Sequence, residues 1–305
     1  MKTLVIGLDG EDDGFWNIGD IGLQLDYNGE LETFYTTFPS FLCSLTGKRY
    51  DPRMQQVDFT SHRTLGHKML WDYLGDIRQT YINIPAAYPA EDVNGSFICG
   101  WKARSLDSNS VRPTSLIPKL EKLGYSFGRD LFGQTAAEGR WDDFLDEGIK
   151  QIHMRTKAIK YLAKQDNPEL LFTVYTTTDE CLHQRIENRL GKNRIRTMNE
   201  ILSEDLSSLI DEIQPETTIF FSDHSINEMG YHGPDHPETK WGTWGLITDL
   251  EHIPPRDKAH ILDIFPTILA SLDLDIPAVE GSSLIYSESD KKVFTDRLRR
   301  LGYIE

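Results

Sequence analysis

The sequence predicts an α/β fold, with a doubly wound, mostly parallel central sheet and helices on both of its faces. Short apolar segments of strand length alternate with longer amphipathic segments of helix length. The intervals between the apolar segments are long enough for the crossover helices that parallel strands require. The chain has 305 residues, of which 39% are hydrophobic and 26% charged, as in ordinary globular proteins. We therefore expect a single domain over residues 1–305.

Four apolar segments are the predicted strands of the sheet. In order they are Thr3–Leu8, Thr80–Ile84, Leu170–Thr178 and Thr217–Ser222. Helical patterns precede the last two: an amphipathic stretch over about 141–163, and apolar residues at steps of three or four over 195–213. Trp244–Thr248 is a candidate later strand, and Ala259–Leu272 is predicted to be a helix despite Pro266.

The stretch Gly100–Gly139 differs from the rest, because it is rich in Ser, Pro, Gly and charge and has no clear strand pattern. We predict a small irregular cap over about 100–139. Trp101, Lys102, Arg104 and Arg112 within it are candidates to contact a negatively charged substrate, although basic residues are equally common in ordinary surface loops.

The amino-acid composition limits the binding partners and the cellular compartment that we expect. A net charge of −16 repels phosphate backbones and anionic lipids, so we expect neither a nucleic-acid polymer nor a membrane as partner. The three cysteines show no CxxC spacing, which favours a reducing compartment over a disulfide framework. No apolar stretch approaches the ~20 residues of a membrane span, and the first apolar run is shorter than a signal-peptide core. A cytoplasmic protein of undefined oligomeric state is expected.

An acidic residue follows three of the predicted strands. These residues are Asp9, Asp179 and Asp223. The carboxyl ends of parallel strands meet at one edge of a sheet, where ligands of open α/β folds bind. A single aspartate at such a place is more often a helix cap or a turn residue. Its repetition after three strands favours a shared ligand site instead.

Four histidines near these aspartates are candidate metal ligands: His183, His224, His232 and His236. The first lies four residues after Asp179, so the two would share one face of a helix, and the second follows Asp223 directly. Carboxylate and imidazole together suit Zn²⁺ or Mn²⁺. The last two lie in a loop rich in Gly and Pro, where an exposed, non-ligating histidine is equally common.

The segment Thr36–Gly47 is predicted to be a short helix. Thr37 is the candidate N-cap, Pro39 is tolerated in the first turn, and Gly47 ends the helix. A helix N-terminus attracts anions, and a hydroxyl there can attack phosphorus if a metal lowers its pKa. From this segment alone, a plain capping threonine is the favoured alternative.

Four motifs follow one another along the chain: VIGLDG, TFPSFLCSLTG, TTTDECLH and FFSDHS. In this order they resemble the alkaline phosphatase superfamily, and more closely its type I phosphodiesterase/nucleotide pyrophosphatase branch. The nucleophile motif of that branch, T-F-P-N-x-x-x-x-x-T-G, is matched by Thr37, Phe38, Pro39, Thr46 and Gly47. The segments 82–95 and 261–277 also resemble this branch, so the similarity spans most of the chain.

The resemblance implies a hydrolase of small phosphoesters that uses two divalent metals, usually zinc and sometimes manganese or magnesium. Thr37 would be the nucleophile and form a phosphothreonine. One metal would be held by Asp9, Thr37, Asp223 and His224. The other would be held by Asp179, His183 and either His236 or His232. Of these two, His236 is preferred, because the last ligand of the family lies shortly before a strand.

The substrate would be contacted by Phe38, through its backbone N–H, and by Ser40. The sequence departs from the family at Ser40, where asparagine is common, at Ser225, where glycine is usual, and after Gly47, where PxxHG is absent. Alternatives are a phosphomonoesterase, a sulfatase, a metal-dependent phosphomutase, or a metal- or nucleotide-binding protein without catalysis. The sulfatase motif C-x-P-x-R is missing, and VIGLDGEDDG lacks the dinucleotide-binding G-x-G-x-x-G. The physiological substrate is not predicted.

Overall fold

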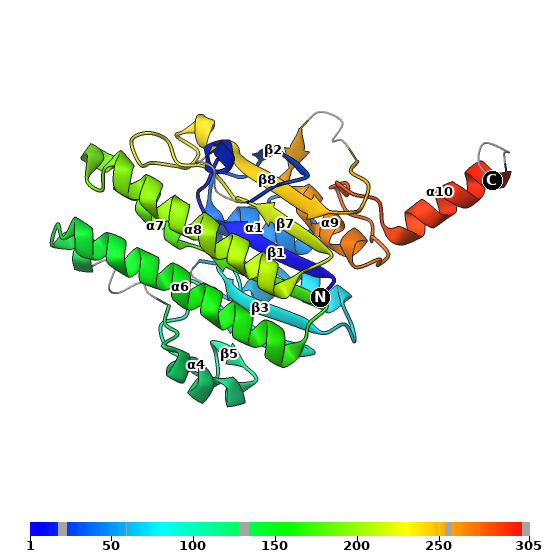
Figure 1. The fold of residues 1–305 in the computed structure, drawn as a ribbon, viewed down its shortest axis with the longest axis horizontal. Helices are drawn as coiled ribbons and strands as arrows, with labels where there is room; N and C mark the ends of the chain where they lie inside the picture. Colours follow the sequence, from blue (N-terminus) through cyan, green and yellow to red (C-terminus); the bar gives the residue numbers. More distant parts are fainter. Residues whose placement is uncertain (18–22, 59, 128–133, 254–257, 301–305) are drawn as a thin grey trace.

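The computed structural model describes residues 1–17, 23–58, 60–127, 134–253 and 258–300. Within these residues a nine-stranded sheet runs through the molecule in the order β5-β4-β3-β6-β1-β7-β8-β2-β9 (Figure 1). The strands are β1 (Thr3–Leu8), β2 (Tyr27–Glu32), β3 (Gln79–Ile84), β4 (Gly95–Cys99), β5 (Val111–Arg112), β6 (Leu170–Tyr175), β7 (Thr217–Phe221), β8 (Trp241–Thr248) and β9 (Ala259–His260).

The centre of the sheet is parallel and its margins are mixed. β4, β3, β6, β1 and β7 all pair in parallel, whereas β5 on one side and β8 on the other pair antiparallel. Every residue of β1, β3, β6 and β7 is buried, which explains their continuous apolar character. These strands correspond to the four predicted from the sequence, except that β6 ends at Tyr175 instead of Thr178, because α7 begins at Thr177. The mostly parallel α/β sheet is confirmed.

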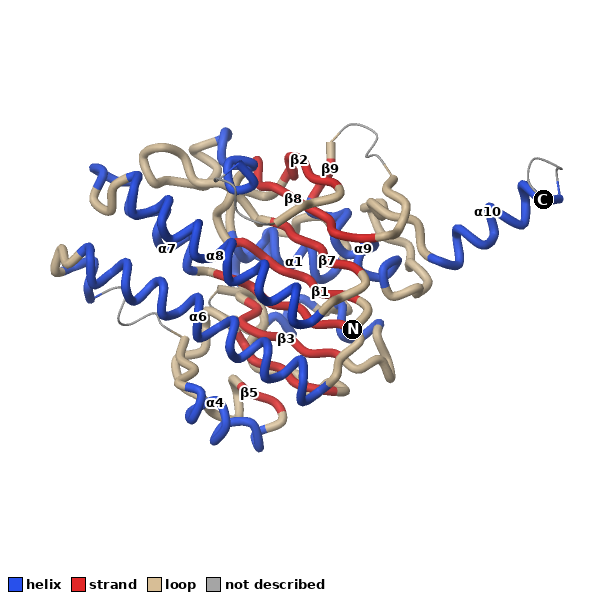
Figure 2. The backbone as a smooth tube through the Cα atoms, in the orientation of Figure 1, coloured by secondary structure: helices blue, strands red, loops and turns tan. Residues whose placement is uncertain are grey.

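Helices cover both faces of the sheet (Figure 2). The α-helices are α1 (Thr37–Thr46), α2 (Pro52–Gln56), α3 (Leu70–Tyr73), α4 (Ile117–Leu123), α6 (Trp141–Asp166), α7 (Thr177–Leu182), α8 (Lys192–Ile213), α9 (Ile264–Ser271) and α10 (Glu288–Arg300). Short 3-10 turns are η1 (Asp13–Asn17), η2 (His62–Leu65), η3 (Thr114–Leu116), η4 (His183–Asn188), η5 (Pro237–Lys240) and η6 (Ile261–Asp263). α10 projects away from the body of the molecule (Figure 1).

The two faces of β1 belong to two separate apolar clusters. Leu4 and Ile6 pack with residues of α6 and α8, whereas Val5 packs with residues of α1 and α9. Gly7 lets α1 approach the sheet closely, since a Cβ there would lie 2.9 Å from Cε1 of Phe41. This close packing holds the N-terminus of α1 beside the end of β1.

Several elements differ from the expectations. β2, β4, β5 and β9 were not predicted, and the expected helix over 259–272 is divided into β9, η6 and α9. Pro266 lies in the first turn of α9, where its missing N–H costs no hydrogen bond. The predicted cap over 100–139 contains β5 and α4, so its described part is more regular than expected, while 128–133 lie outside the described residues.

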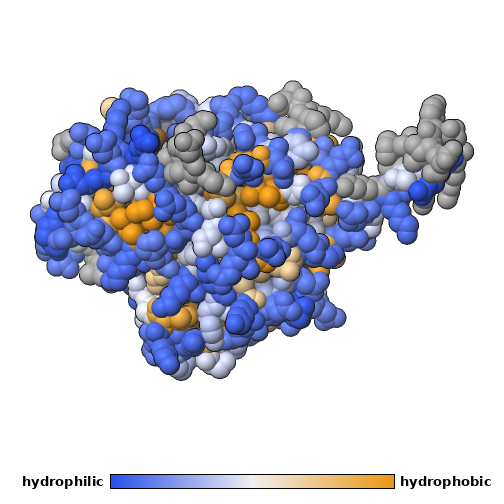
Figure 3. Space-filling model, viewed as in Figure 1, coloured by the Kyte–Doolittle hydropathy of each residue, from blue (hydrophilic) through white to orange (hydrophobic). Residues whose placement is uncertain are grey.

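The surface seen in Figure 3 is mostly hydrophilic, with separate hydrophobic patches. Cys43, Cys99 and Cys181 are buried and unpaired. None of the helices in the described ranges has the length and apolar character that crossing a membrane requires.

Candidate metal centre

The three aspartates predicted to converge lie together at the carboxyl ends of the central strands. Asp9 follows β1 directly, Asp179 is the third residue of α7 after β6, and Asp223 lies two residues beyond β7. The strands β6, β1 and β7 are neighbours and end at the same level, because Leu8 pairs with Tyr175 in the register. The N–H of Gly10 donates to Oδ1 of Asp223 at 3.2 Å and joins two of the three loops.

Thr37 lies at this edge with its hydroxyl facing the cluster. Its Oγ1 is 3.2 Å from Nε2 of His224 and 3.5 Å from Oδ1 of Asp9. The prediction that Thr37 is the N-cap was wrong by one residue. Thr36 has the extended backbone of the cap position, with φ −144° and ψ 152°, and α1 begins at Thr37. The Thr37 hydroxyl is therefore not used for capping.

His224 occupies the middle of the cluster. Its Nε2 lies 3.3 Å from Oδ2 of Asp223, 3.5 Å from Oδ1 of Asp9 and 3.9 Å from Oδ1 of Asp179. Its Nδ1 faces the backbone carbonyl of Ser225 at 3.2 Å. Since a carbonyl oxygen only accepts, the proton belongs on Nδ1 and the lone pair on Nε2 points at the carboxylates.

Two further histidines have the same orientation. Nδ1 of His183 lies 2.8 Å from the carbonyl of Gly230, and its Nε2 lies 3.4 Å from Oδ1 of Asp179. Nδ1 of His232 lies 2.9 Å from the carbonyl of Tyr35, and its ring stacks on that of His224 at 4.1 Å. A backbone partner on one ring nitrogen, with the other nitrogen free, is the arrangement found in metal-bound histidines.

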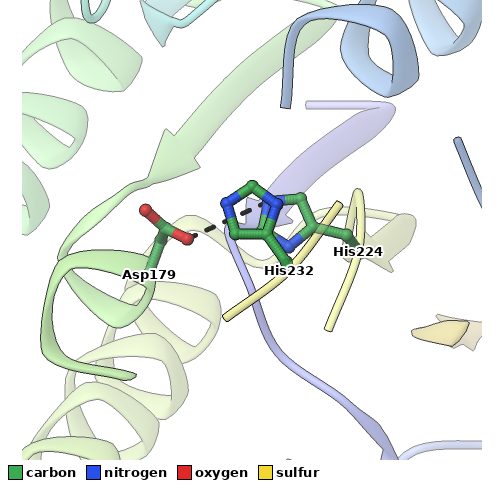
Figure 4. Close-up of side chains that lie close together, drawn as sticks. All are labelled: Asp179, His224 and His232. Atoms are coloured by element: carbon green, nitrogen blue, oxygen red, sulfur yellow. Dashed lines mark ion pairs between the residues drawn. The ribbon is translucent and has the colours of Figure 1, made fainter. Parts of the chain in front are cut away.

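Two groups of side chains have ligand atoms that all lie within 4.8 Å of one another. One group is Asp9, Asp223 and His224, and the other is Asp179, His224 and His232. Figure 4 shows Asp179 pointing at the stacked rings of His224 and His232. Each group offers three ligand atoms of the kinds that zinc or manganese binds.

His236, the preferred last ligand, is in neither group. Its Nδ1 lies 3.3 Å from Nδ2 of Asn227, and its ring stacks on that of Tyr231. Of the two loop histidines, the structure thus places His232 beside Asp179 and His224, whereas His236 is separated from β8 by the turn η5. Which of the two is the last ligand stays a prediction.

Burial makes the cluster electrostatically unusual. It raises the pKa of Asp9 and Asp179 well above the ordinary value, with added repulsion from neighbouring carboxylates, and raises the pKa of Asp223 to about 6. Burial also lowers the pKa of His224 to about 3 and that of His232 to about 4. Each charged form is penalised by the loss of water.

The cluster fits a bound cation. Oδ1 of Asp179 and Oδ2 of Asp223 are buried and accept no hydrogen bond from the described residues. In the described part of the chain, no lysine or arginine forms an ion pair with any of the three aspartates. Buried carboxylate oxygens that lack a hydrogen bond and a cationic partner are costly, and a divalent ion would compensate them.

The two expected substrate contacts have different environments. Phe38 stacks on Trp101, with ring centroids 5.6 Å apart and planes at 15°, which brings the predicted cap to the start of α1. Ser40 is fully buried, and its hydroxyl accepts a hydrogen bond from the N–H of Phe34 at 3.1 Å. The Ser40 side chain is therefore engaged inside the fold.

The basic residues of the predicted cap are engaged elsewhere or exposed. Nζ of Lys102 donates to the carbonyls of Val57 and Thr60, Arg112 pairs with Asp92, and Arg104 is exposed. Of the four cap residues singled out in the sequence, Trp101 contacts α1 through the ring of Phe38.

Sequence reasoning missed the backbone groups that orient the histidines. The carbonyl that faces His232 belongs to Tyr35, a residue with a left-handed backbone at φ 65°. A side chain other than glycine is rarely found in this conformation, and such strain is often located at functional sites. A backbone carbonyl has no sequence signature, so no residue pattern would have identified it.

No protein-family model and no curated protein sequence matches this chain. Among solved structures, an inactive form of murine ectonucleotide pyrophosphatase/phosphodiesterase 5 in complex with AMP matches 92% of this chain and 97% of its own, with 10% identity and a TM-score of 0.51. A protein of the alkaline phosphatase superfamily from Vibrio parahaemolyticus matches 92% of this chain and 69% of its own, with 15% identity and a TM-score of 0.48.

A shorter match is phosphoglycerate mutase from Leishmania mexicana, with 15% identity and a TM-score of 0.37. It covers 48% of this chain and 30% of the mutase. At these identities the likeness concerns the fold. The match to the murine protein confirms the alkaline phosphatase-like fold class that the ordered motifs led us to expect.

Proposed function

We propose that this chain is a metal-dependent phosphoester hydrolase of the alkaline phosphatase superfamily, of the phosphodiesterase/nucleotide pyrophosphatase type, with Thr37 as its nucleophile. The observation that carries the proposal is the position of the Thr37 hydroxyl. Its Oγ1 lies 3.2 Å from His224 and 3.5 Å from Asp9, at the N-terminus of a helix. A hydroxyl between candidate metal ligands at such a place is suited to attack a bound phosphoryl group.

Seven residues divide into two sets that would hold two divalent metals, zinc or manganese being the best match to the donors. The first set is Asp9, Thr37, Asp223 and His224, and the second is Asp179, His183 and His232. The buried, unpartnered oxygens of Asp179 and Asp223 support this assignment. Two such ions would supply Lewis-acid stabilisation of the phosphoryl oxygens and lower the pKa of the Thr37 hydroxyl.

The chain's own residues then account for the reaction. Oγ1 of Thr37 attacks phosphorus and gives its proton to solvent water, the P–O bond to the leaving group breaks, and the released alkoxide takes a proton from water to leave as the alcohol. With a diester, the phosphothreonine that forms keeps the second ester group. A water molecule then attacks the same phosphorus, the P–O bond to Oγ1 breaks, the monoester product leaves, and Oγ1 regains a proton from water. The first N–H groups of α1 have no intrahelical partners, so they are available to stabilise the negative oxygens.

The proposed substrate is a small phosphoester. The net charge of −16 disfavours a nucleic-acid polymer or an anionic membrane as partner, and three buried, unpaired cysteines support a reducing, cytoplasmic location. A thiol-derived sulfatase nucleophile is disfavoured, because Cys43 lies fully buried within α1 and burial raises the pKa of its thiol. A sulfatase acting through Thr37 is separated from a phosphodiesterase by the experiment below.

The test compares Thr37→Ala with Thr36→Ala, the neighbouring threonine whose side chain makes no capping hydrogen bond. Turnover of bis-nitrophenyl phosphate, nitrophenyl phosphate and nitrophenyl sulfate is measured, together with metal content. We expect Thr37→Ala to lower diester turnover by at least about 10³-fold with little metal loss, since it removes the nucleophile. Thr36→Ala should retain turnover. Equal turnover in both variants would refute the role of Thr37, and a preference for the sulfate ester would refute the phosphodiesterase.

A further inference from the structure

The backbone of Asp9 is held at both ends by the segment that leads into Asp179. The N–H of Asp9 donates to the carbonyl of Tyr175, the last residue of β6, at 3.0 Å. The carbonyl of Asp9 in turn accepts a hydrogen bond from the hydroxyl of Thr178, the second residue of α7. The position of Asp9, a proposed ligand of the first metal, is therefore set by residues next to Asp179, a proposed ligand of the second.

The hydrogen bond from Thr178 is the side-chain part of this connection. Thr178 is fully buried and lies 169 positions from Asp9 in the sequence. Threonine hydroxyls in a helix usually bond to a backbone group a few residues away. The carbonyl of Tyr175 is in that place, at 3.3 Å, but the carbonyl of Asp9 is closer, so the single hydroxyl proton goes to Asp9. The side chain thus joins two loops instead of serving its own helix turn.

Other buried threonines of the sheet show that such a hydrogen bond is not automatic. Thr173 in β6 and Thr218 in β7 are fully buried, and their hydroxyls make no hydrogen bond with the described residues. A further buried hydroxyl, that of Ser222, donates to the carbonyl of a proposed ligand, His224, at 2.7 Å. That bond spans two residues of one loop, whereas the bond from Thr178 connects the two sets of proposed ligands.

The two loops approach each other closely at this point. Gly10 follows Asp9 with a φ of 81°, and a Cβ at this position would lie 3.1 Å from Cα of Asp179. Oδ1 of Asp9 lies 3.5 Å from Oγ1 of Thr37 and 3.5 Å from Nε2 of His224. A small shift of the Asp9 backbone would therefore change the geometry of the first set of ligands.

We propose that Thr178 is a positioning residue of the metal centre, whose hydroxyl fixes Asp9 relative to Asp179 and thereby sets the geometry in which two ions bind. Groups that orient metal ligands through hydrogen bonds, without touching the metal, typically contribute about 10–100-fold to metal affinity. The inference rests on the proposed metal ligands, but not on the reaction assigned to them. Zinc binding can therefore test it without a substrate.

The test compares Thr178→Val with Thr173→Val in the purified full chain. Both changes replace a fully buried hydroxyl by a methyl group, but the Thr178 hydroxyl is hydrogen-bonded, whereas the Thr173 hydroxyl has no partner among the described residues. Zinc affinity is measured by competition with a chromophoric chelator, and the melting temperature is measured on the metal-free protein. We expect Thr178→Val to weaken zinc binding by about 10-fold or more. Thr173→Val should stay within about 2-fold of the wild type, since it removes no hydrogen bond.

Thr178→Ser separates the hydroxyl from the methyl group. It should keep zinc affinity within about 3-fold of the wild type, because the donor to Asp9 remains. If the role of Thr178 is only structural, Thr178→Val will lower the melting temperature and leave zinc affinity unchanged, and that result would overturn the proposal. If Thr178→Val does not fold, Thr178→Ala takes its place, and equal zinc affinity in Thr178→Ala and Thr178→Ser would overturn the proposal as well. A wild type that binds no zinc would refute the metal centre itself, and the role of Thr178 with it.

Discussion

The two halves of the proposed metal centre differ in how deeply they are buried. Asp9, Asp223 and His224 form a closed half and are 1%, 0% and 0% exposed. Asp179 and His183 belong to an open half, where the His183 side chain is 33% exposed. The closed half is built on the ends of β1 and β7, whereas the open half relies on α7, η4 and the loop that carries His232. We infer that the closed half binds its ion tightly and the open half exchanges ion, substrate and water.

The largest effect is expected in the closed half. Asp223→Asn removes a buried carboxylate of the proposed ligand set. A bound metal supplies several kcal/mol of transition-state stabilisation, so turnover of the diester should fall by about 10³-fold or more. The control is Asp235→Asn, which changes an exposed aspartate in the same region of the chain and should alter turnover less than about 2-fold. Comparable losses of turnover in Asp223→Asn and Asp235→Asn would contradict a specific role for the closed half.

Substitutions in the open half should lower turnover less than those in the closed half. His232→Ala is expected to lower turnover by about 10–100-fold, and excess zinc should restore part of it, because solvent reaches this half. His236→Ala, four residues away, should change turnover less than about 3-fold, since His236 contacts Tyr231 and Asn227 instead of the aspartates. Measuring zinc dependence of turnover in both variants decides which histidine is the ligand. A larger loss in His236→Ala would contradict the assignment.

The two halves also differ in how far their residues can be predicted from the sequence. The closed half was predictable, because Asp9 and Asp223 follow buried strands whose apolar pattern is unambiguous, and parallel neighbours bring their ends together. The open half was less predictable. The choice between His232 and His236 depends on how a loop with positive-φ glycines at 230 and 233 folds, which has no periodic signal. For the same reason the antiparallel margin strands were missed: β5 and β9 have two residues each, and β2 has an exposed, polar pattern.

A smaller effect concerns stability of the metal-free protein. Burial raises the pKa of Asp223 from 3.8 to about 6 in the folded state, so the folded chain holds this proton more strongly than the unfolded chain. The contribution to stability is present below pH 3.8 and is lost as pH rises through about 6. The Asp223→Asn variant has no carboxyl to ionise and does not lose this stability. In the presence of chelator, its free energy of unfolding relative to that of the wild type should therefore rise between pH 4 and 7, by roughly 1–3 kcal/mol.

Melting temperatures of both proteins across this pH range, in the presence of chelator, test the sign. Asp235→Asn, measured in parallel, is the control for an Asp-to-Asn change at an exposed position. If the difference in melting temperature between Asp223→Asn and the wild type stays constant or decreases with rising pH, folding does not raise the pKa of Asp223.

The central claim is that separate parts of the chain form one centre for two divalent ions around Thr37. Its most direct test is the metal content of the purified chain after dialysis against zinc, determined by elemental analysis. We expect about two zinc ions per wild-type chain and about one in His232→Ala, which keeps the closed half. A wild-type chain that retains no zinc, or an Asp9→Asn variant that retains as much as the wild type, would contradict it.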